Sequence, residues 1–247
     1  ETTTSSSPDI DFHIDNFVVE AIPSCLNPTS LSANTITNNS ATATWVAGAT
    51  ETLWNLEYGV TGFTQGAGTL VNDLTSTTYN FTSLSGNTNY SFYVQANCGS
   101  STSPWSGPYS FKTLCDAVSI PITQNFDGVT TPNLPDCWSK KIVSTSSAAL
   151  TTSTTYHSAS NGVYFSNSGD AASQLFLISP KIVQNLNTLR VKLWAYSYGT
   201  YPVKVGVMTD PTDAATFVEI ASYPTSSTWT ERITDLNSYS GSATYIA

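Results

Sequence analysis

The stretch Leu84-Ser85-Gly86-Asn87-Thr88-Asn89-Tyr90-Ser91-Phe92-Tyr93-Val94-Gln95 holds the pattern that decides the fold. A leucine stands six residues before a tyrosine, and from that tyrosine onward the sequence has the side-chain alternation of a strand. Similar alternation recurs over 41–45, 190–194 and 203–207, and turn residues separate such runs about every ten positions. No segment carries a sustained helical pattern of apolar residues. The chain is therefore predicted to be all-β.

The composition excludes some classes of partner. Only 10% of the 247 residues are charged, and 17 acidic against 8 basic residues give a net charge of -9. Nucleic-acid binding needs clustered Lys and Arg, so no nucleic-acid partner is expected. No apolar run approaches the roughly 20 residues of a membrane span. The polar N-terminus is unlike a signal peptide, so we expect any export signals to lie outside this chain.

Residues 24–114 are predicted to form one domain. Trp45 and Tyr58 stand where large core rings are expected, and Leu84 and Tyr90 have the spacing of a tyrosine corner. The segment 103–108 then leads into a last strand. Together these residues resemble a fibronectin type III domain, which implies an immunoglobulin-like sandwich. The seven expected strands lie at 29–35, 40–46, 53–60, 67–72, 77–82, 88–98 and 106–113.

Residues 115–247 are predicted to form a second β-sandwich. Its opening combines Cys115, the run Gln124-Asn125-Phe126-Asp127-Gly128 and the run Leu134-Pro135-Asp136-Cys137-Trp138. This opening resembles the jelly-roll modules called cleaved-adhesin or MAM-like domains, common on surface proteins of Bacteroidetes. The segments that match later strands of that family are 162–166, 175–182, 189–196, 203–209, 229–232 and 243–247.

The family expects one more apolar strand with an internal Asp, and residues 12–20 have its form. We therefore expect residues 1–23 to supply the closing strand of a preceding or partner jelly roll. In that arrangement the chain is one period of a tandem array, and strand 10–20 of one copy completes its own or another copy's sandwich by strand addition.

The four cysteines are expected to form two disulfides. No C-x-x-C pair occurs and the chain has only two histidines, so a structural zinc site is not expected. Four cysteines allow three pairings. The pairing that keeps each bond inside one predicted domain joins Cys25 to Cys98 and Cys115 to Cys137. Disulfides are typical of secreted proteins.

Calcium is the cofactor that the resemblance implies. In the jelly-roll family, an acidic residue after the first strand and an Asp in the last strand help to hold the ion. Carried over to this chain, these residues are Asp127 and Asp15. Calcium takes six to eight oxygen ligands, and neither Asp has an acidic partner within two residues. The alternative is that Asp127 turns the chain beside Gly128 and that Asp15 caps a strand end.

Catalytic motifs are not found in the sequence. It contains no G-x-S-x-G elbow, phosphate loop or H-E-x-x-H motif. His13 lies in a predicted strand and His157 in a Ser/Thr-rich turn. Asp210 and Asp213 flank a proline in a turn, where Asp is common. The chain is therefore expected not to be an enzyme.

Aromatic residues could bind a ligand. Tyr198 and Tyr201 fall in a predicted exposed loop, where aromatic rings can stack on sugars. Trp194 and Tyr196 share a strand face and are interpreted as core residues.

The function expected from the sequence is a non-catalytic structural and adhesive repeat of a secreted or cell-surface bacterial protein, in an array that could form a filament. Its partners would be neighbouring copies, other surface proteins or glycans. The alternative is a carbohydrate-binding accessory module of a secreted hydrolase or protease. A tandem array of similar repeats would favour the first function, and a single adjacent catalytic domain would favour the second.

Overall fold

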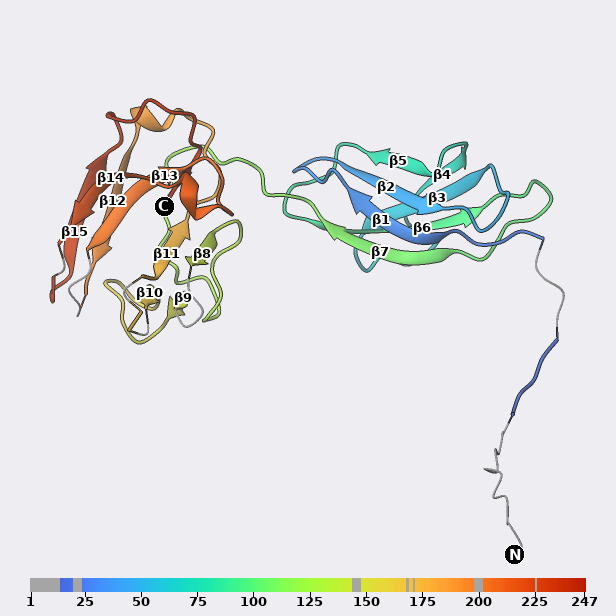
Figure 1. Ribbon diagram of the computed structural model, residues 1–247, viewed down its shortest axis with the longest axis horizontal. Helices are drawn as coiled ribbons and strands as arrows, with labels where there is room; N and C mark the ends of the chain where they lie inside the picture. The colour runs from blue at the N-terminus through green and yellow to red at the C-terminus, as the bar shows by residue number, and fades with distance from the viewer. Residues whose placement is uncertain are drawn as a thin grey trace, which may run out of the picture.

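The chain folds into two β units joined by a linker, as the computed structural model shows (Figure 1). The described part contains only strands and two three-residue 3-10 helices as regular elements, so the prediction of an all-β chain is confirmed. The residues that the structure describes are 14–19, 24–143, 148–167, 169–170, 172–197, 202–224 and 226–247.

The first unit contains all seven strands predicted for it, each with ends within two residues of the expected positions. One antiparallel sheet has the strand order β1-β2-β5 and the other has the order β4-β3-β6-β7. The strands are β1 (Thr29–Asn34), β2 (Ala41–Val46), β3 (Trp54–Val60), β4 (Thr69–Leu74), β5 (Thr78–Phe81), β6 (Asn89–Ala96) and β7 (Ser106–Lys112).

Aromatic rings fill the space between these two sheets. Trp45 and Trp54 meet edge to face, with ring centroids 6.1 Å apart, and both are buried. Phe81 is fully buried and lies 4.8 Å from Tyr58 and 5.4 Å from Phe111, measured between ring centroids. Trp45 and Tyr58 therefore take the core positions predicted for them. Aromatic pairs at these separations stabilise a core beyond the area they bury.

The connection from β5 to β6 is closed by the predicted tyrosine corner. The backbone N–H of Ser85 donates a hydrogen bond of 3.0 Å to the hydroxyl of Tyr90, and Leu84 is buried beside it. The hydroxyl of Thr113 donates to the carbonyl of Ser85 at 2.7 Å and accepts from the N–H of Thr88 at 2.9 Å. These bonds fix the end of the unit from which the linker departs.

The chain enters the first unit and leaves it at opposite ends (Figure 1). At one end, the side-chain amide of Asn27 donates to the hydroxyl of Ser106, which begins β7. At the other end, the N–H of Leu114 donates to the carbonyl of Thr37, which follows β1. Strands β1 and β7 therefore run in the same direction along the unit.

The second unit consists of short antiparallel ladders. β8 pairs with β11, β9 with β10 and β12 with β15, and β13 lies between β14 and β16. The segments predicted as strands in this unit each overlap one. The elements are β8 (Ser139–Val143), β9 (Ala148–Thr152), β10 (Gly162–Ser166), β11 (Gln174–Ile178), η1 (Leu186–Thr188), β12 (Arg190–Ala195), β13 (Val203–Met208), η2 (Ala214–Thr216), β14 (Val218–Tyr223), β15 (Thr230–Asp235) and β16 (Tyr245–Ile246).

A small apolar core packs against β12, β13, β14 and β16. Its buried side chains lie in η1, in β13 and in the loops before η1, after β15 and before β16: Ile182, Leu186, Val207, Leu236 and Ala243. The identity of the second unit as a jelly roll stays a prediction.

Both predicted disulfides form. Cys25 bonds to Cys98 within the first unit, and Cys115 bonds to Cys137 at the start of the second. Each bond therefore closes a loop inside one unit.

Residues 14–19 lie away from both units, beyond the end of the first unit where β1 begins (Figure 1). They form no strand in this single chain, and the rest of the predicted strand 10–20 lies outside the described residues. Four of the six side chains are apolar, and they are 74–82% exposed: Ile14, Phe17, Val18 and Val19.

Candidate functional site

Asp127, the first predicted calcium ligand, connects two loops of the second unit. One carboxylate oxygen accepts hydrogen bonds from the backbone N–H groups of Ser160 and Asn161, the latter at 2.9 Å. The other oxygen accepts from the side-chain amide of Asn125 at 2.8 Å. The side-chain amide of Asn161 in turn donates to the carbonyls of Phe126 and Val129. Both carboxylate oxygens therefore already accept bonds from protein donors.

Asp15, the second predicted ligand, lies in the exposed segment 14–19. Its carboxylate accepts a bond of 2.8 Å from the N–H of the next residue, Asn16. Among the described residues no three His, Cys, Asp or Glu side chains gather closely enough to hold a metal ion. Segment 14–19 lies away from the second unit, so Asp15 and Asp127 are not brought together in this structure. Calcium binding stays a prediction.

The predicted ligand residues Tyr198 and Tyr201 lie outside the described residues, but the strand before them presents an aromatic face. The interpretation of Trp194 as a core residue is wrong, because its side chain is 47% exposed. Trp194 shares a face of β12 with Arg190 and Lys192, both of which are exposed. Since side chains alternate along a strand, these charged neighbours place Trp194 on the solvent side.

The aromatic face continues onto β15. Trp194 pairs across the ladder with Glu231, and Lys192 pairs with Ile233, which is 46% exposed. Just beyond the ladder, the rings of Tyr196 and Trp229 lie 5.5 Å apart. Cross-strand neighbours have Cβ atoms about 5 Å apart, so rings and charged groups form a compact surface. Below, "aromatic face" means Lys192, Trp194, Tyr196, Trp229, Glu231 and the histidine described next.

His157 completes the aromatic face from a distant loop between β9 and β10. Its ring stacks on Trp194 with a centroid distance of 3.9 Å and an interplanar angle of 12°. It also meets Trp229 edge to face at 5.8 Å. The sequence carried no signal for this contact, because the loop and β12 are joined only by the tertiary fold. Alternation along β12 could have identified the exposure of Trp194.

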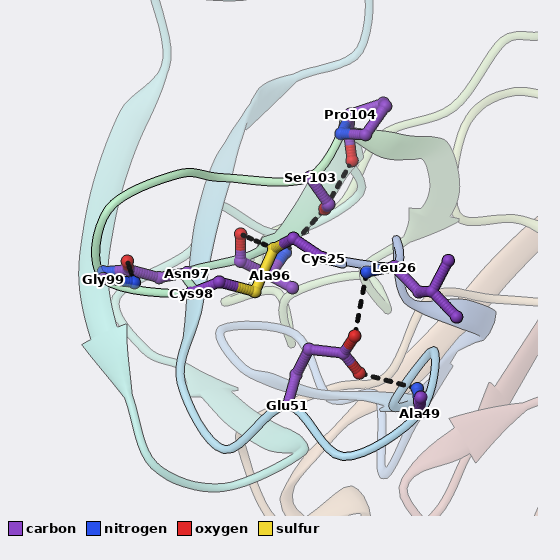
Figure 2. The surroundings of a disulfide bond; sticks show 10 residues. All are labelled: Cys25, Leu26, Ala49, Glu51, Ala96, Asn97, Cys98, Gly99, Ser103 and Pro104. Carbon is purple, nitrogen blue, oxygen red and sulfur yellow. Dashed lines mark hydrogen bonds between the residues drawn. A yellow bond between two sulfur atoms is a disulfide. The ribbon is translucent and has the colours of Figure 1, made fainter. Parts of the chain in front are cut away.

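The Cys25–Cys98 disulfide anchors the end of the first unit where the chain enters (Figure 2). Beside it, the carboxylate of Glu51 accepts bonds from the N–H of Leu26 at 2.8 Å and from the N–H of Ala49 at 2.6 Å. Partial desolvation by itself raises the pKa of Glu51, but these backbone donors outweigh it and hold the pKa below its ordinary value of 4.5. The contacts hold the loop before β3 against the residues that precede β1.

Asp210 and Asp213 act as turn residues, as predicted. The carboxylate of Asp210 accepts from the N–H and the hydroxyl of Thr212, both at 2.7 Å, and these bonds lower its pKa. Asp213 caps η2 by accepting from the N–H of Ala215. Both carboxylates are thus used in local backbone structure.

The geometry of the first unit places it in the class of immunoglobulin-like β-sandwiches with a tyrosine corner. The sequence model of the fibronectin type III domain matches residues 26–112. Residues 26–112 are therefore a fibronectin type III domain, a type of module that is typically non-catalytic and commonly mediates protein interactions. A comparison with curated proteins finds no significant match.

Solved structures similar to the chain include fibronectin-type domains from two animals. The FN5 domain of Drosophila Lar is 18% identical, and the alignment covers 37% of this chain and 99% of that one, with a TM-score of 0.32. The chicken CNTN1 FN1-FN3 domains are 18% identical over 35% of this chain and 30% of theirs, with a TM-score of 0.33. In the part of the chain that the structure describes, no helix is long and apolar enough to cross a membrane.

Proposed function

We propose that this chain is a non-catalytic structural and adhesive repeat of a secreted or cell-surface bacterial protein, and that copies join through residues 14–19. The observation that carries the proposal is the exposure of four apolar side chains in this short segment. Contiguous exposed apolar surface marks an interaction site in soluble proteins. The bacterial surface origin rests on the resemblance of the opening of the second unit to adhesin modules.

The disulfides support an extracellular location. Both cysteine pairs are oxidised, and such bonds persist in oxidising compartments. A fibronectin type III domain also fits this setting, as does the surface, which is rich in Thr and Ser and poor in charge.

The length of the chain between residues 14–19 and the first unit limits which copy can receive this segment. Val19 and Cys25 are six positions apart in the chain, so their Cα atoms lie at most about 22 Å apart when the connection is fully extended. Strand β7 alone, with its seven residues, is about 24 Å long, and the second unit begins beyond its far end. The end of the segment nearest the first unit therefore falls short of the second unit of its own copy, which favours pairing with another copy.

Strand β13 has a partly unpaired edge to which another strand can be added. Among the described residues, pairing of β13 on the side of β16 extends over Gly206, Val207 and Met208 only. Its first half, Val203–Val205, pairs with β14 on the other side. Backbone groups at such an edge accept an added strand, whose apolar side chains then enter the core.

The free energies favour only weak association of isolated copies. Side chains alternate along a strand, so Phe17 and Val19 face one side and Ile14 and Val18 the other, and burial of one such pair contributes about 1.5–3 kcal/mol per side chain. Ordering six backbone residues costs about 1–2 kcal/mol each, and association itself costs several more. Untethered copies should therefore associate weakly, whereas repeats in one array would pair at a high effective concentration.

The test compares the wild-type chain with the double variant Phe17→Asp and Val19→Asp. Both positions are exposed, so the variant should fold normally. Amide hydrogen exchange over residues 14–19 is measured at increasing protein concentration, together with sedimentation velocity. We expect protection of these amides to grow with concentration in the wild type and to vanish in the variant.

The control is Val46→Asp, which places a charge at an exposed apolar position of the first unit, 55% exposed. It should behave as the wild type does. Unprotected amides at every concentration in the wild-type chain would refute assembly through residues 14–19.

A further inference from the structure

We infer that the aromatic face on β12 and β15 is a binding site for neutral polysaccharides built of β-linked pyranoses. This inference rests on the adhesive part of the proposed function and gives it a ligand class. It is independent of assembly through residues 14–19.

The first reason is the solvent exposure of the Trp194 side chain. Because His157 covers one face of the indole, the exposed 47% of the side chain belongs to its other face and its edges. An exposed tryptophan on a strand costs hydrophobic free energy unless a ligand covers it. The apolar face of a pyranose, with its axial C–H groups, is flat and matches an aromatic ring in size.

The second reason is that the rings are held in place before any ligand arrives. Trp194 is fixed by His157, and Trp229 is in contact with both His157 and Tyr196. The two pairs that include Trp229 lie at centroid distances typical of stabilising aromatic contacts, and the His157–Trp194 stack is closer, at 3.9 Å. A site whose side chains are already ordered pays less entropy on binding, which matters for a ligand as weakly held as a sugar.

The third reason is the polar chemistry beside the rings. Glu231 lies directly across the ladder from Trp194, and Lys192 precedes Trp194 on the same face. Both are exposed, and within the described residues the only salt bridge is between Lys204 and Glu219. A carboxylate and an ammonium next to a ring can bond to the equatorial hydroxyls of a stacked sugar. An apolar protein surface docked on this face would leave both charged groups buried and unpaired. A glycan can bond to them through its hydroxyls, so the alternation of rings and charges favours a glycan.

The experiment is affinity electrophoresis of the full 247-residue chain through gels that contain hydroxyethyl cellulose, xyloglucan, mixed-linkage β-glucan or galactomannan. We expect at least one polysaccharide to retard the wild-type chain. Trp194→Ala should weaken the retardation at least about tenfold in dissociation constant. Trp194→Phe keeps a flat ring and should retain most of the binding, and Glu231→Gln should weaken it less than Trp194→Ala does.

Trp105→Ala is the matched control, because it removes a half-buried tryptophan from the first unit. It should leave retardation unchanged. Sedimentation of Trp194→Ala should equal that of the wild type, which separates this site from the 14–19 contact. No retardation by any of the four polysaccharides overturns the inference, as does equal retardation of Trp194→Ala and wild type. A loss of self-association in Trp194→Ala without polysaccharide binding would assign the face to protein contact instead.

Discussion

At the scale of single residues, several carboxylates of this chain hold loops together. Asp127 joins two loops of the second unit, and Glu51 joins the loop before β3 to the start of the first unit. Both bind backbone N–H groups. A calcium ion at Asp127 would have to compete with donors already in place.

Glu51 gives the first unit a specific dependence on pH. Its pKa is lower in the folded chain than its ordinary value of 4.5. The unfolded chain therefore binds the proton more readily, and the contribution to stability is complete above pH 4.5 and disappears as the pH falls through the folded pKa. We expect Glu51→Gln to destabilise the unit at neutral pH and to have a smaller effect in acid.

The measurement is urea unfolding of the wild type and Glu51→Gln at a series of pH values, followed by the fluorescence of the buried tryptophans. The difference in unfolding free energy should decrease with acidity. A difference that is constant from neutral pH to pH 3 would show that the carboxylate bonds contribute nothing specific.

At the scale of elements, Glu57 organises the turn between β3 and β4. Its side chain is only 3% exposed, and its carboxylate accepts bonds from the N–H groups of Gly66 and Gly68 at 2.7–3.0 Å. Gly66 has φ of +92°, a conformation that favours glycine. The turn thus folds around a buried acceptor.

We expect Glu57→Gln to destabilise the first unit by about 1.5–3 kcal/mol, because the amide loses the negative charge and replaces Oε2, which also accepts from Gly66, with an NH2 group, and bonds to a charged group are strong. Thermal unfolding monitored by circular dichroism is the measurement. Glu219→Gln is the control, since it breaks an exposed pair worth at most about 1 kcal/mol. Equal losses in the two variants would contradict this role for Glu57.

The strands could be predicted from sequence because their signal is local. Alternation and turn residues located β1 to β7 within two residues, and the spacing from Leu84 to Tyr90 located the corner. The aromatic face could not be found in the same way. Its His157–Trp194 stack joins residues far apart in the sequence, and a pattern of period two shows which residues share a face without showing which face is covered.

At the scale of the whole molecule, two units with separate cores and separate disulfides should unfold independently. Removing a disulfide relaxes the unfolded state of its own unit only. From the sequence separations of 73 and 22 residues, loop entropy gives losses of about 4 kcal/mol for Cys25→Ala/Cys98→Ala and about 3 kcal/mol for Cys115→Ala/Cys137→Ala.

Differential scanning calorimetry can measure whether the two units unfold independently. We expect the wild type to show two transitions and each double variant to lower one of them. If either pair of substitutions shifted both transitions equally, the units would be energetically coupled and this description would be wrong.

The position of the Cys25–Cys98 bond also determines how the first unit carries mechanical load. Tension applied to the two ends of the unit acts on Cys25 and is transmitted through the disulfide bond directly to Cys98, which follows β6. Residues 26–97 lie inside the covalent loop that this bond closes, so tension cannot extend them. Only the short stretch from Gly99 through β7 to Leu114 can extend under tension. In an oxidising medium, tension therefore changes the end-to-end length of the domain only a little.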